Sequence, residues 1–421
     1  MNKSESIFTR RASRRSFLAK GSMAAGVATM GVGLLGDGVP AFAEDEDSGS
    51  LTRGDAAILR FLQALETIEA DLWRQYSELG GASASSGTAG FSPIDLKDQN
   101  GNPITTGLAA LYIGGLQILD SDMPQYIVDN TDDEFSHESF LKNYLLSKGA
   151  DVVDLSRFAT LSPSQVTGVP NIGRLTNLTQ LTVDTTWWTR YRSDSKNPDL
   201  GDSFEQAIPS LATGQHTAIP RTNADLVADP SQQGGVGIHT QAIAFTAGFH
   251  FGFIEQGGSS LYPSLAQRVS NLEVLRILLS IGPTETMHFQ TWQDKAGNAL
   301  QITDTDTGFP GSTGATVSFP NLNAGIDPNN PSQVNPDPTV ADQFQTNLIM
   351  PEPTFFLKKK FGRVSIIRPT ETRGAAMGAL QGLINDGLFI GHTSKSGKSD
   401  GFLELLRDLA EDADEATRGG A

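Results

Sequence analysis

Two short motifs in the sequence combine residue types that hold metal ions in helical proteins. Each places a glutamate three positions before a histidine, with Glu134 before His137 and Glu285 before His288. On a helix this spacing puts both side chains on one face, within reach of a shared ion. The chain has only six histidines, so a chance origin for two such pairs is uncommon. The two motifs therefore predict a metal site.

Two further glutamates are each followed by a large aromatic residue seven positions later. Glu66 precedes Trp73 in this way, and Glu255 precedes Tyr262. Seven residues make about two helical turns, so each aromatic side chain lies on the same face as its glutamate. Both glutamates have apolar neighbours, where a buried charge is costly unless a cation compensates it. We therefore expect both glutamates to join the metal site.

Four predicted helices must position these residues. Apolar residues at helical spacing predict helices at 55–79, in the segment that ends at Gly149, at 240–262 and at 270–295. A glutamate helix and a Glu-x-x-His helix are followed by a long insertion and then by the same pair again. Two such halves can face each other across a bundle axis, and six ligands from four helices can hold two metal ions. The candidate metal ligands are Glu66, Glu134, His137, Glu255, Glu285 and His288.

This order of segments resembles the ferritin-like superfamily, and particularly its exported branch related to plant desiccation-related proteins. The residues that follow the order of that branch are Glu255, Gly258, Tyr262, Glu285 and His288. The resemblance implies an all-α fold, a left-handed four-helix bundle that carries a carboxylate-bridged pair of iron or manganese ions. It also implies that Glu134 and Glu285 are the bridging ligands.

Two features depart from a simple ferritin-like pattern. Glu69 lies nearer the middle of the apolar stripe than Glu66 and has its own aromatic residue, Tyr76, seven positions on. Only the family pattern favours Glu66 as the ligand. Gly282-Pro283 stands just before Glu285, and a proline inside a helix bends the axis. The bend either re-aims the second Glu-x-x-His motif or marks a degenerate site.

The regions outside the four helices are long and less regular. An insertion at 150–237 is broken by six prolines and is not expected to hold long helices. With this insertion, residues 51–300 form the predicted bundle. Residues 301–421 read as a mixed extension that packs on it, with a loop-rich start, a short strand at 364–367, a helix at 373–384 and an acidic helix from Phe402.

The first 43 residues resemble a twin-arginine signal peptide. Ser13-Arg14-Arg15-Ser16-Phe17-Leu18 precedes a glycine-rich apolar run, and Ala41-Phe42-Ala43 gives a small-x-small cleavage pattern. The apolar run is too short to cross a bilayer as a helix, which argues against a stable membrane anchor. We therefore expect a periplasmic or extracellular protein, exported in its folded state.

Charge and cysteine content exclude several classes of partner and site. The net charge is −17, and removal of the signal, with six basic and two acidic residues, makes it about −21. This balance argues against nucleic acid and anionic lipid as partners. The chain has no cysteine, so disulfides, thiolate zinc sites and cysteine-held iron-sulfur clusters are excluded. Any metal must be held by oxygen and nitrogen ligands.

Two functional hypotheses follow from these features. In the first, two iron or manganese ions react with a small oxidant, peroxide or dioxygen, in oxidative or desiccation stress. In the second, the chain is a non-catalytic envelope protein that kept the bundle and lost turnover. Iron storage is a weaker third hypothesis, because the long additions obstruct assembly into a cage. A homo-oligomer is compatible with the sequence.

The remaining candidate motifs have ordinary structural interpretations. Residues 391–399 resemble a phosphate loop with one residue too many between its glycines, and we interpret them as a loop. Asp304 and Asp306 lack the later ligands of a calcium loop. Trp187-Trp188 in the insertion belongs either to a lid or a surface for a substrate or partner, or to ordinary packing against the bundle. The histidines without partner spacing are interpreted as structural or surface residues: His216, His239, His250 and His392.

Overall fold

The chain is mostly helical in the computed structural model, with a few short strands. The structure describes residues 51–83, 96–98, 100–191, 203–322, 375–392 and 399–419, together with two strands and two single residues between 352 and 366. The expected signal segment at 1–43 and most of the loop at 391–399 lie outside the described residues. Among the described helices, none combines the length and the apolar character needed to cross a membrane.

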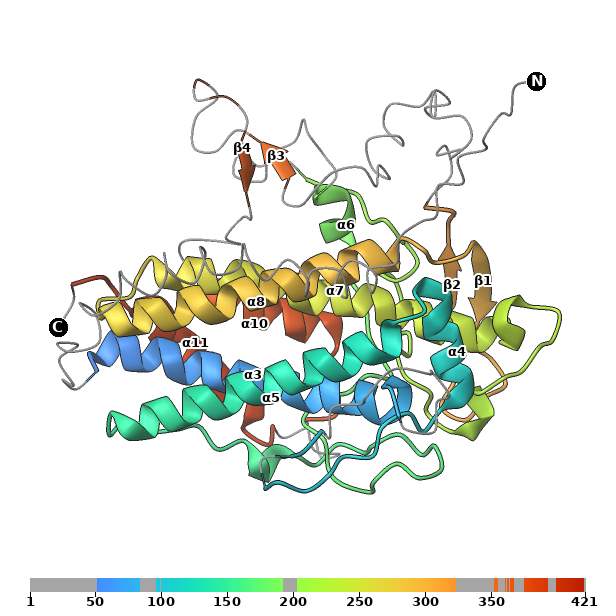
Figure 1. The fold of residues 1–421 in the computed structure, drawn as a ribbon, viewed down its shortest axis with the longest axis horizontal. Helices are drawn as coiled ribbons and strands as arrows, with labels where there is room; N and C mark the ends of the chain where they lie inside the picture. The colour runs from blue at the N-terminus through green and yellow to red at the C-terminus, as the bar shows by residue number, and fades with distance from the viewer. Residues whose placement is uncertain are drawn as a thin grey trace, which may run out of the picture. The chain divides into compact units, whose positions relative to one another are not determined.

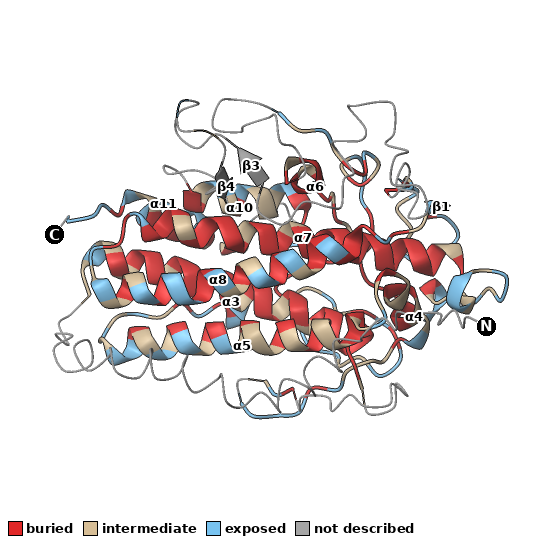
Figure 2. Cartoon of the chain, turned by 45° about the horizontal axis from the view of Figure 1, so that its top comes forward, coloured by how far each residue is buried: buried red, intermediate tan, exposed pale blue. Residues whose placement is uncertain are grey.

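Four long helices run along one another and dominate the structure (Figure 1). They are α3 (Arg53–Gly80), α5 (Met123–Ser147), α7 (Ile238–Ala266) and α8 (Leu272–Ala296). Helix α3 packs along α5, and α7 packs along α8. The residues between the helices are buried, while the outward faces of α5 and α8 are partly exposed (Figure 2). This arrangement gives two helix pairs with a common buried interior.

The ends of α3 and α8 follow from local capping. Thr52 accepts a hydrogen bond from the backbone N–H of Asp55, and the N–H of Gly81 donates to the carbonyl of Ser77. Asn271 caps α8 in the same way, accepting from the N–H groups of Glu273 and Val274. Such side chains satisfy backbone donors that have no partner inside the helix. The predicted ends of these two helices agree with the observed ones to within two residues.

The segment before Gly149 holds two helices rather than the single helix that was predicted. A short helix, α4 (Ala110–Leu119), ends at Asp120, whose backbone is extended, and α5 begins at Met123. Pro124 lies in the first turn of α5, where its missing N–H leaves no helical hydrogen bond unmade. The proline therefore marks the start of α5, and the two Glu-x-x-His residues of this segment lie about three turns later.

In its described residues, 150–191 and 203–237, the insertion contains only short helical segments, as its prolines predicted. They are η1 (Ser156–Phe158), α6 (Thr186–Arg190), η3 (Asn223–Asp225) and η4 (Gln233–Gly235). In α6, Trp187 and Trp188 are buried almost completely. A Cβ at Gly252 of α7 would lie 2.5 Å from the Trp187 ring, so the glycine permits this close approach. Of the two interpretations of this tryptophan pair, packing against the long helices is the one observed.

The region after residue 300 contains a β-hairpin that the sequence interpretation missed. Strands β1 (Ile302–Thr305) and β2 (Thr316–Phe319) pair antiparallel, as do β3 (Glu352–Thr354) and β4 (Val364–Ile366). Helix α10 (Ala375–Asp386) contacts α7, and α11 (Phe402–Glu415) packs along α3. The C-terminal helices therefore cover the α3 and α7 sides of the long helices.

Candidate metal centre

The six predicted ligands meet in the interior between the four long helices. Helix α3 supplies one glutamate, α7 supplies one, and α5 and α8 each supply a Glu-x-x-His pair. Each of the six side chains is buried. We call this set the carboxylate–histidine cluster; its members are Glu66, Glu134, His137, Glu255, Glu285 and His288.

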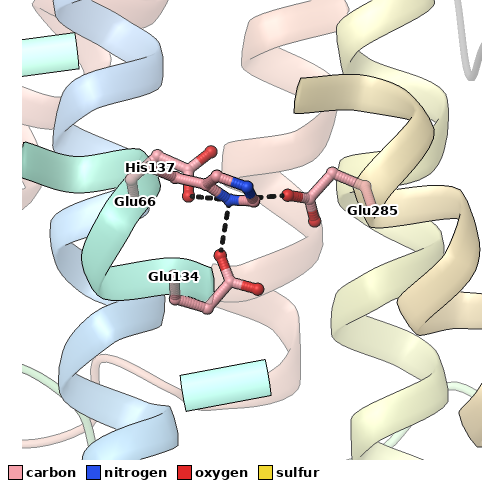
Figure 3. Close-up of side chains that lie close together, drawn as sticks. All are labelled: Glu66, Glu134, His137 and Glu285. Atoms are coloured by element: carbon pink, nitrogen blue, oxygen red, sulfur yellow. Dashed lines mark hydrogen bonds and ion pairs between the residues drawn. The ribbon is translucent and has the colours of Figure 1, made fainter. Parts of the chain in front are cut away.

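One half of the cluster surrounds His137, and we call it the His137 group. Nδ1 of His137 lies 3.2 Å from Oε2 of Glu134, 3.2 Å from Oε1 of Glu285 and 3.4 Å from Oε2 of Glu66 (Figure 3). The three carboxylates thus converge on one imidazole nitrogen from three different helices. Ligand atoms of all four residues lie within 4.8 Å of one another, which is close enough for a single ion.

The other half, the His288 group, repeats this arrangement. Nδ1 of His288 lies 3.2 Å from Oε1 of Glu134 and 3.2 Å from Oε2 of Glu255. Glu285 completes the group, and its ligand atoms also lie within 4.8 Å of one another. Glu134 and Glu285 belong to both groups. These are the two residues for which the family resemblance implied a bridging role.

Pro283 does not displace the second motif. Helix α8 continues from Leu272 to Ala296 with Pro283 inside it. Glu285 and His288 lie after the proline, and both point into the cluster. Of the two readings of Gly282-Pro283, the geometry fits a motif that is still aimed at the site.

Polar residues that the sequence interpretation missed surround the cluster. Oδ2 of Asp133 lies 3.0 Å from Nε2 of His288, and the hydroxyl of Tyr262 donates to Oε1 of Glu66. A carboxylate on the far nitrogen of a histidine fixes the ring and leaves the near nitrogen free for a metal. The only sequence signal for Asp133 was its position directly before a Glu-x-x-His motif. Tyr262 was singled out for its seven-residue spacing from Glu255 on α7, but its hydrogen bond is to Glu66 on α3.

The side chain of Asn130 links two carboxylates of the His288 group: Glu134, which belongs to both groups, and Glu255, which belongs to this group alone. Nδ2 of Asn130 donates to Oε1 of Glu134 at 2.8 Å and to Oε1 of Glu255 at 3.1 Å. Asn130 precedes Glu134 by four residues, so both lie on one face of α5. This spacing was the available sequence signal for Asn130. The side-chain carbonyl oxygen of Asn130 accepts a hydrogen bond from the indole N–H of Trp292 at 2.8 Å.

The electrostatics of the cluster show an excess of negative charge. Burial, together with repulsion from Glu285, raises the pKa of Glu134 to about 7. Burial and the neighbouring carboxylates raise the pKa of Glu285 to about 8. The pKa of His137 and that of His288 are both raised, because attraction by the surrounding glutamates outweighs burial. Without a bound cation, the cluster balances its charge with protons.

The donor set fits divalent metal ions. Oε2 of Glu66 and Oε1 of Glu285 are buried and face Nδ1 of His137 at 3.4 and 3.2 Å, while Oε2 of Glu285 has no hydrogen-bond partner among the described residues. Burying several carboxylates with so few donors is costly unless a cation is near. Four ionised glutamates carry four negative charges, and two divalent ions would neutralise them. Carboxylate oxygens and imidazole nitrogens suit iron and manganese. The residues present therefore fit a site for divalent metal.

Glu69, the alternative to Glu66, lies outside both ligand groups. It lines a cavity of about 180 Å³ between α3, α6, α7 and α10. Burial and the charges of the cluster glutamates raise its pKa well above the usual range. Gly258 also lines this cavity, and a Cβ there would lie 2.6 Å from Oε2 of Glu285. The cavity therefore approaches the cluster at Gly258, with Glu285 directly behind the glycine backbone.

The other singled-out residues are engaged elsewhere. His216, His239, His250 and His392 are buried and hydrogen-bonded. Asp304 bonds to His239, and Asp306 pairs with Arg221, so neither is arranged as a calcium ligand.

Comparisons of the chain with protein-family models, with curated proteins and with solved structures gave no match. The carboxylate–histidine cluster is therefore the feature of the molecule from which a function can be inferred.

Proposed function

We propose that the chain is an exported ferritin-like protein whose carboxylate–histidine cluster holds two iron or manganese ions and reduces peroxide or dioxygen. The observation that carries this proposal is the pair of ligand groups that share Glu134 and Glu285. A four-helix bundle with one glutamate on each of two helices and a Glu-x-x-His pair on each of the others is the ferritin-like arrangement. Export rests on the twin-arginine pattern in the first 43 residues.

The chain's own residues have distinct roles in this proposal. Glu134 and Glu285, which belong to both ligand groups, would hold both ions, and each histidine would hold one of them. Asp133 orients His288 through Nε2, and Tyr262 orients Glu66. The ions, when bound, supply open positions for the oxidant and electrons for its reduction. Loading requires that Glu134 and Glu285 lose the protons they hold, so metal uptake releases protons.

The cavity beside Gly258 supports access of a small molecule to the cluster. It is too small for a large organic substrate but has ample room for peroxide or dioxygen. Apolar side chains such as Leu65 and Ile254 line it together with charged ones such as Glu69 and Arg190. The size of the cavity therefore favours a small molecule such as peroxide or dioxygen.

The test combines metal analysis with peroxide consumption. The parent protein, loaded with iron or manganese, should contain two ions per chain and consume hydrogen peroxide. A variant carrying Glu134→Ala and His288→Ala should lose both properties. Glu411→Gln, an exposed position on α11, is the control and should behave as the parent.

Two outcomes would count against the proposal. If the parent binds neither metal and the double variant has unchanged stability, the metal site does not exist. If metal is bound in the cluster but peroxide and dioxygen are left unchanged, the ions are structural and the non-catalytic alternative holds.

A further inference from the structure

A line of buried contacts leads away from the cluster toward α10. It begins at Asn130, which bonds to Glu134 and Glu255 and accepts from the indole N–H of Trp292. Trp292 stacks on Trp73, with ring centroids 5.3 Å apart and ring planes at 24°. One edge of the cluster is therefore in contact with a pair of stacked indoles.

The stacked indoles continue to a tyrosine. The ring centroids of Trp73 and Tyr76 are 5.7 Å apart. Phe251 packs against Trp292, Trp73 and Tyr76, with centroid distances of 4.9, 4.8 and 4.6 Å. All four rings are buried. We call Trp292, Trp73 and Tyr76 the aromatic path.

The path ends at a hydrogen-bonded base. The hydroxyl of Tyr76 lies 2.7 Å from Nδ1 of His250, and Nε2 of His250 lies 3.0 Å from Oδ2 of Asp386 on α10. All three side chains are buried. Burial raises the pKa of Tyr76 well above its usual range, so the phenol keeps its proton and donates a hydrogen bond to Nδ1. Nε2 then carries the ring proton and donates to Asp386.

A clustered aromatic core alone would carry no inference, because such packing is common. An imidazole base distinguishes Tyr76 from Tyr112. Tyr112 is equally buried, but its hydroxyl donates to the backbone carbonyl of Ala218, which cannot take up a proton. A phenol that loses an electron becomes strongly acidic, so an adjacent imidazole makes the loss far easier. Trp73, whose buried indole N–H has no partner among the described residues, can only pass an electron on.

We propose that Tyr76 supplies one electron to the metal centre through Trp73 and Trp292 while its phenolic proton moves to His250. This inference rests on the proposed function, with hydrogen peroxide as the oxidant. The electron from Tyr76 is needed in turnovers in which only one of the two metal ions starts in its reduced state. The second electron then comes from the protein, and peroxide is not left half-reduced as a hydroxyl radical.

The electrons and protons of this step balance. Reduction of one hydrogen peroxide to two waters breaks the O–O bond and consumes two electrons, together with two protons that come from solvent. One electron comes from the reduced metal ion and one from Tyr76. The phenolic O–H bond breaks, and its proton forms an N–H bond at Nδ1 of His250. The products on the protein are a neutral tyrosyl radical and an imidazolium stabilised by the carboxylate of Asp386.

The first experiment is freeze-quench electron paramagnetic resonance after peroxide is mixed with the metal-loaded protein. Ring-deuterated tyrosine identifies the radical by narrowing its signal. The signal should be lost in Tyr76→Phe and kept in Tyr112→Phe, the matched control. His250→Gln should lower its yield at least tenfold although Tyr76 is present, because glutamine cannot accept the proton. Trp73→Phe should lower the yield similarly, since phenylalanine is not oxidised.

A second experiment separates this inference from the proposed function. Flash oxidation of the metal-free protein by an excited ruthenium complex with a sacrificial quencher oxidises tryptophan without any bound metal. A neutral tyrosyl radical should form at Tyr76 in the parent and in Tyr112→Phe but not in Tyr76→Phe. Failure to form it in folded parent protein overturns the aromatic path, whatever the metal results. A peroxide-induced radical that persists in Tyr76→Phe overturns it as well.

Discussion

Two buried ionic clusters in this molecule are built on opposite principles. The Arg221 cluster consists of Arg221, Asp225 and Asp306, with His239 bonded to Asp225 and Asp304. The guanidinium of Arg221 makes paired hydrogen bonds to both Asp225 and Asp306, at 2.7 to 3.0 Å. The carboxylate–histidine cluster has no arginine or lysine in its ligand groups, and its four carboxylates have two histidines between them. The carboxylates of the first cluster are paired with Arg221. The second cluster has more carboxylates than positively charged partners, so a bound cation would stabilise it.

The pKa values of the carboxyl groups express the same difference. In the Arg221 cluster, hydrogen bonds from His239 and Arg221 overcome burial and lower the pKa of Asp225 to about 2. In the carboxylate–histidine cluster, burial and mutual repulsion raise the pKa of Glu134 to about 7 and that of Glu285 to about 8. A buried carboxylate with a cationic partner stabilises a fold, whereas unpaired ones store unfavourable energy that a ligand can relieve.

The largest expected effect is an opposite response to neutralising one carboxylate in each cluster. Asp225→Asn leaves Arg221 without part of its buried partner and should cost about 3 to 5 kcal/mol of unfolding free energy. Glu285→Gln should raise the stability of the metal-free protein at pH 8, because it removes one repelling charge. Urea unfolding of both variants without metal measures this. Equal destabilisation by the two changes would erase the contrast between the clusters.

The second effect is the pH dependence of stability in the metal-free protein. The folded pKa values of Glu134 and Glu285 exceed the unfolded value, so the folded state holds more protons between pH 5 and pH 8. Unfolding free energy should therefore fall by several kcal/mol as pH rises through this window. The contribution of Asp225 changes only below about pH 4, where its stabilisation is lost as pH falls.

Metal should reverse the slope in that window, because bound ions require deprotonated ligands. The measurement is a series of urea titrations from pH 5 to pH 8, with and without manganese. A metal-free slope of the opposite sign would mean that Glu134 and Glu285 do not hold extra protons in the folded state.

The smallest effect concerns Asp133, which is half exposed and bonds to Nε2 of His288. Asp133→Asn weakens the orientation of the imidazole and should lower metal affinity about tenfold. Asp132→Asn is the matched control, since Asp132 neighbours it on α5 and has no hydrogen bond to the cluster in the described part of the chain. Competition titration with a chelator measures both. An equal loss in the two variants would indicate a general effect of negative charge rather than support of His288.

The sequence predicted the parts of the site that depend on helical periodicity. The i, i+3 spacing of each Glu-x-x-His pair and the seven-residue spacing of Glu66 and Glu255 to aromatics are local, and helix geometry turns them directly into faces. Periodicity also predicted the four long helices. It could not decide between Glu66 and Glu69, because adjacent turns of α3 differ only in what they meet across the interior.

Contacts between distant segments were not predictable in this way. Asp386 lies 136 residues after His250, and Trp292 lies 162 residues after Asn130, yet each pair is hydrogen-bonded. No local pattern links such residues, because tertiary packing brings them together. The β1–β2 hairpin was missed for a different reason, since its strands are only four residues long and carry many polar residues.

The proposal that the carboxylate–histidine cluster binds metal is tested most directly by locating the bound metal in a crystal structure. Crystals of the metal-loaded protein, measured on both sides of the iron and manganese absorption edges, locate the ions by their anomalous scattering. The account predicts two peaks, one in the His137 group and one in the His288 group, with Glu134 and Glu285 between them. Metal bound elsewhere, with no peak in either group, would contradict it.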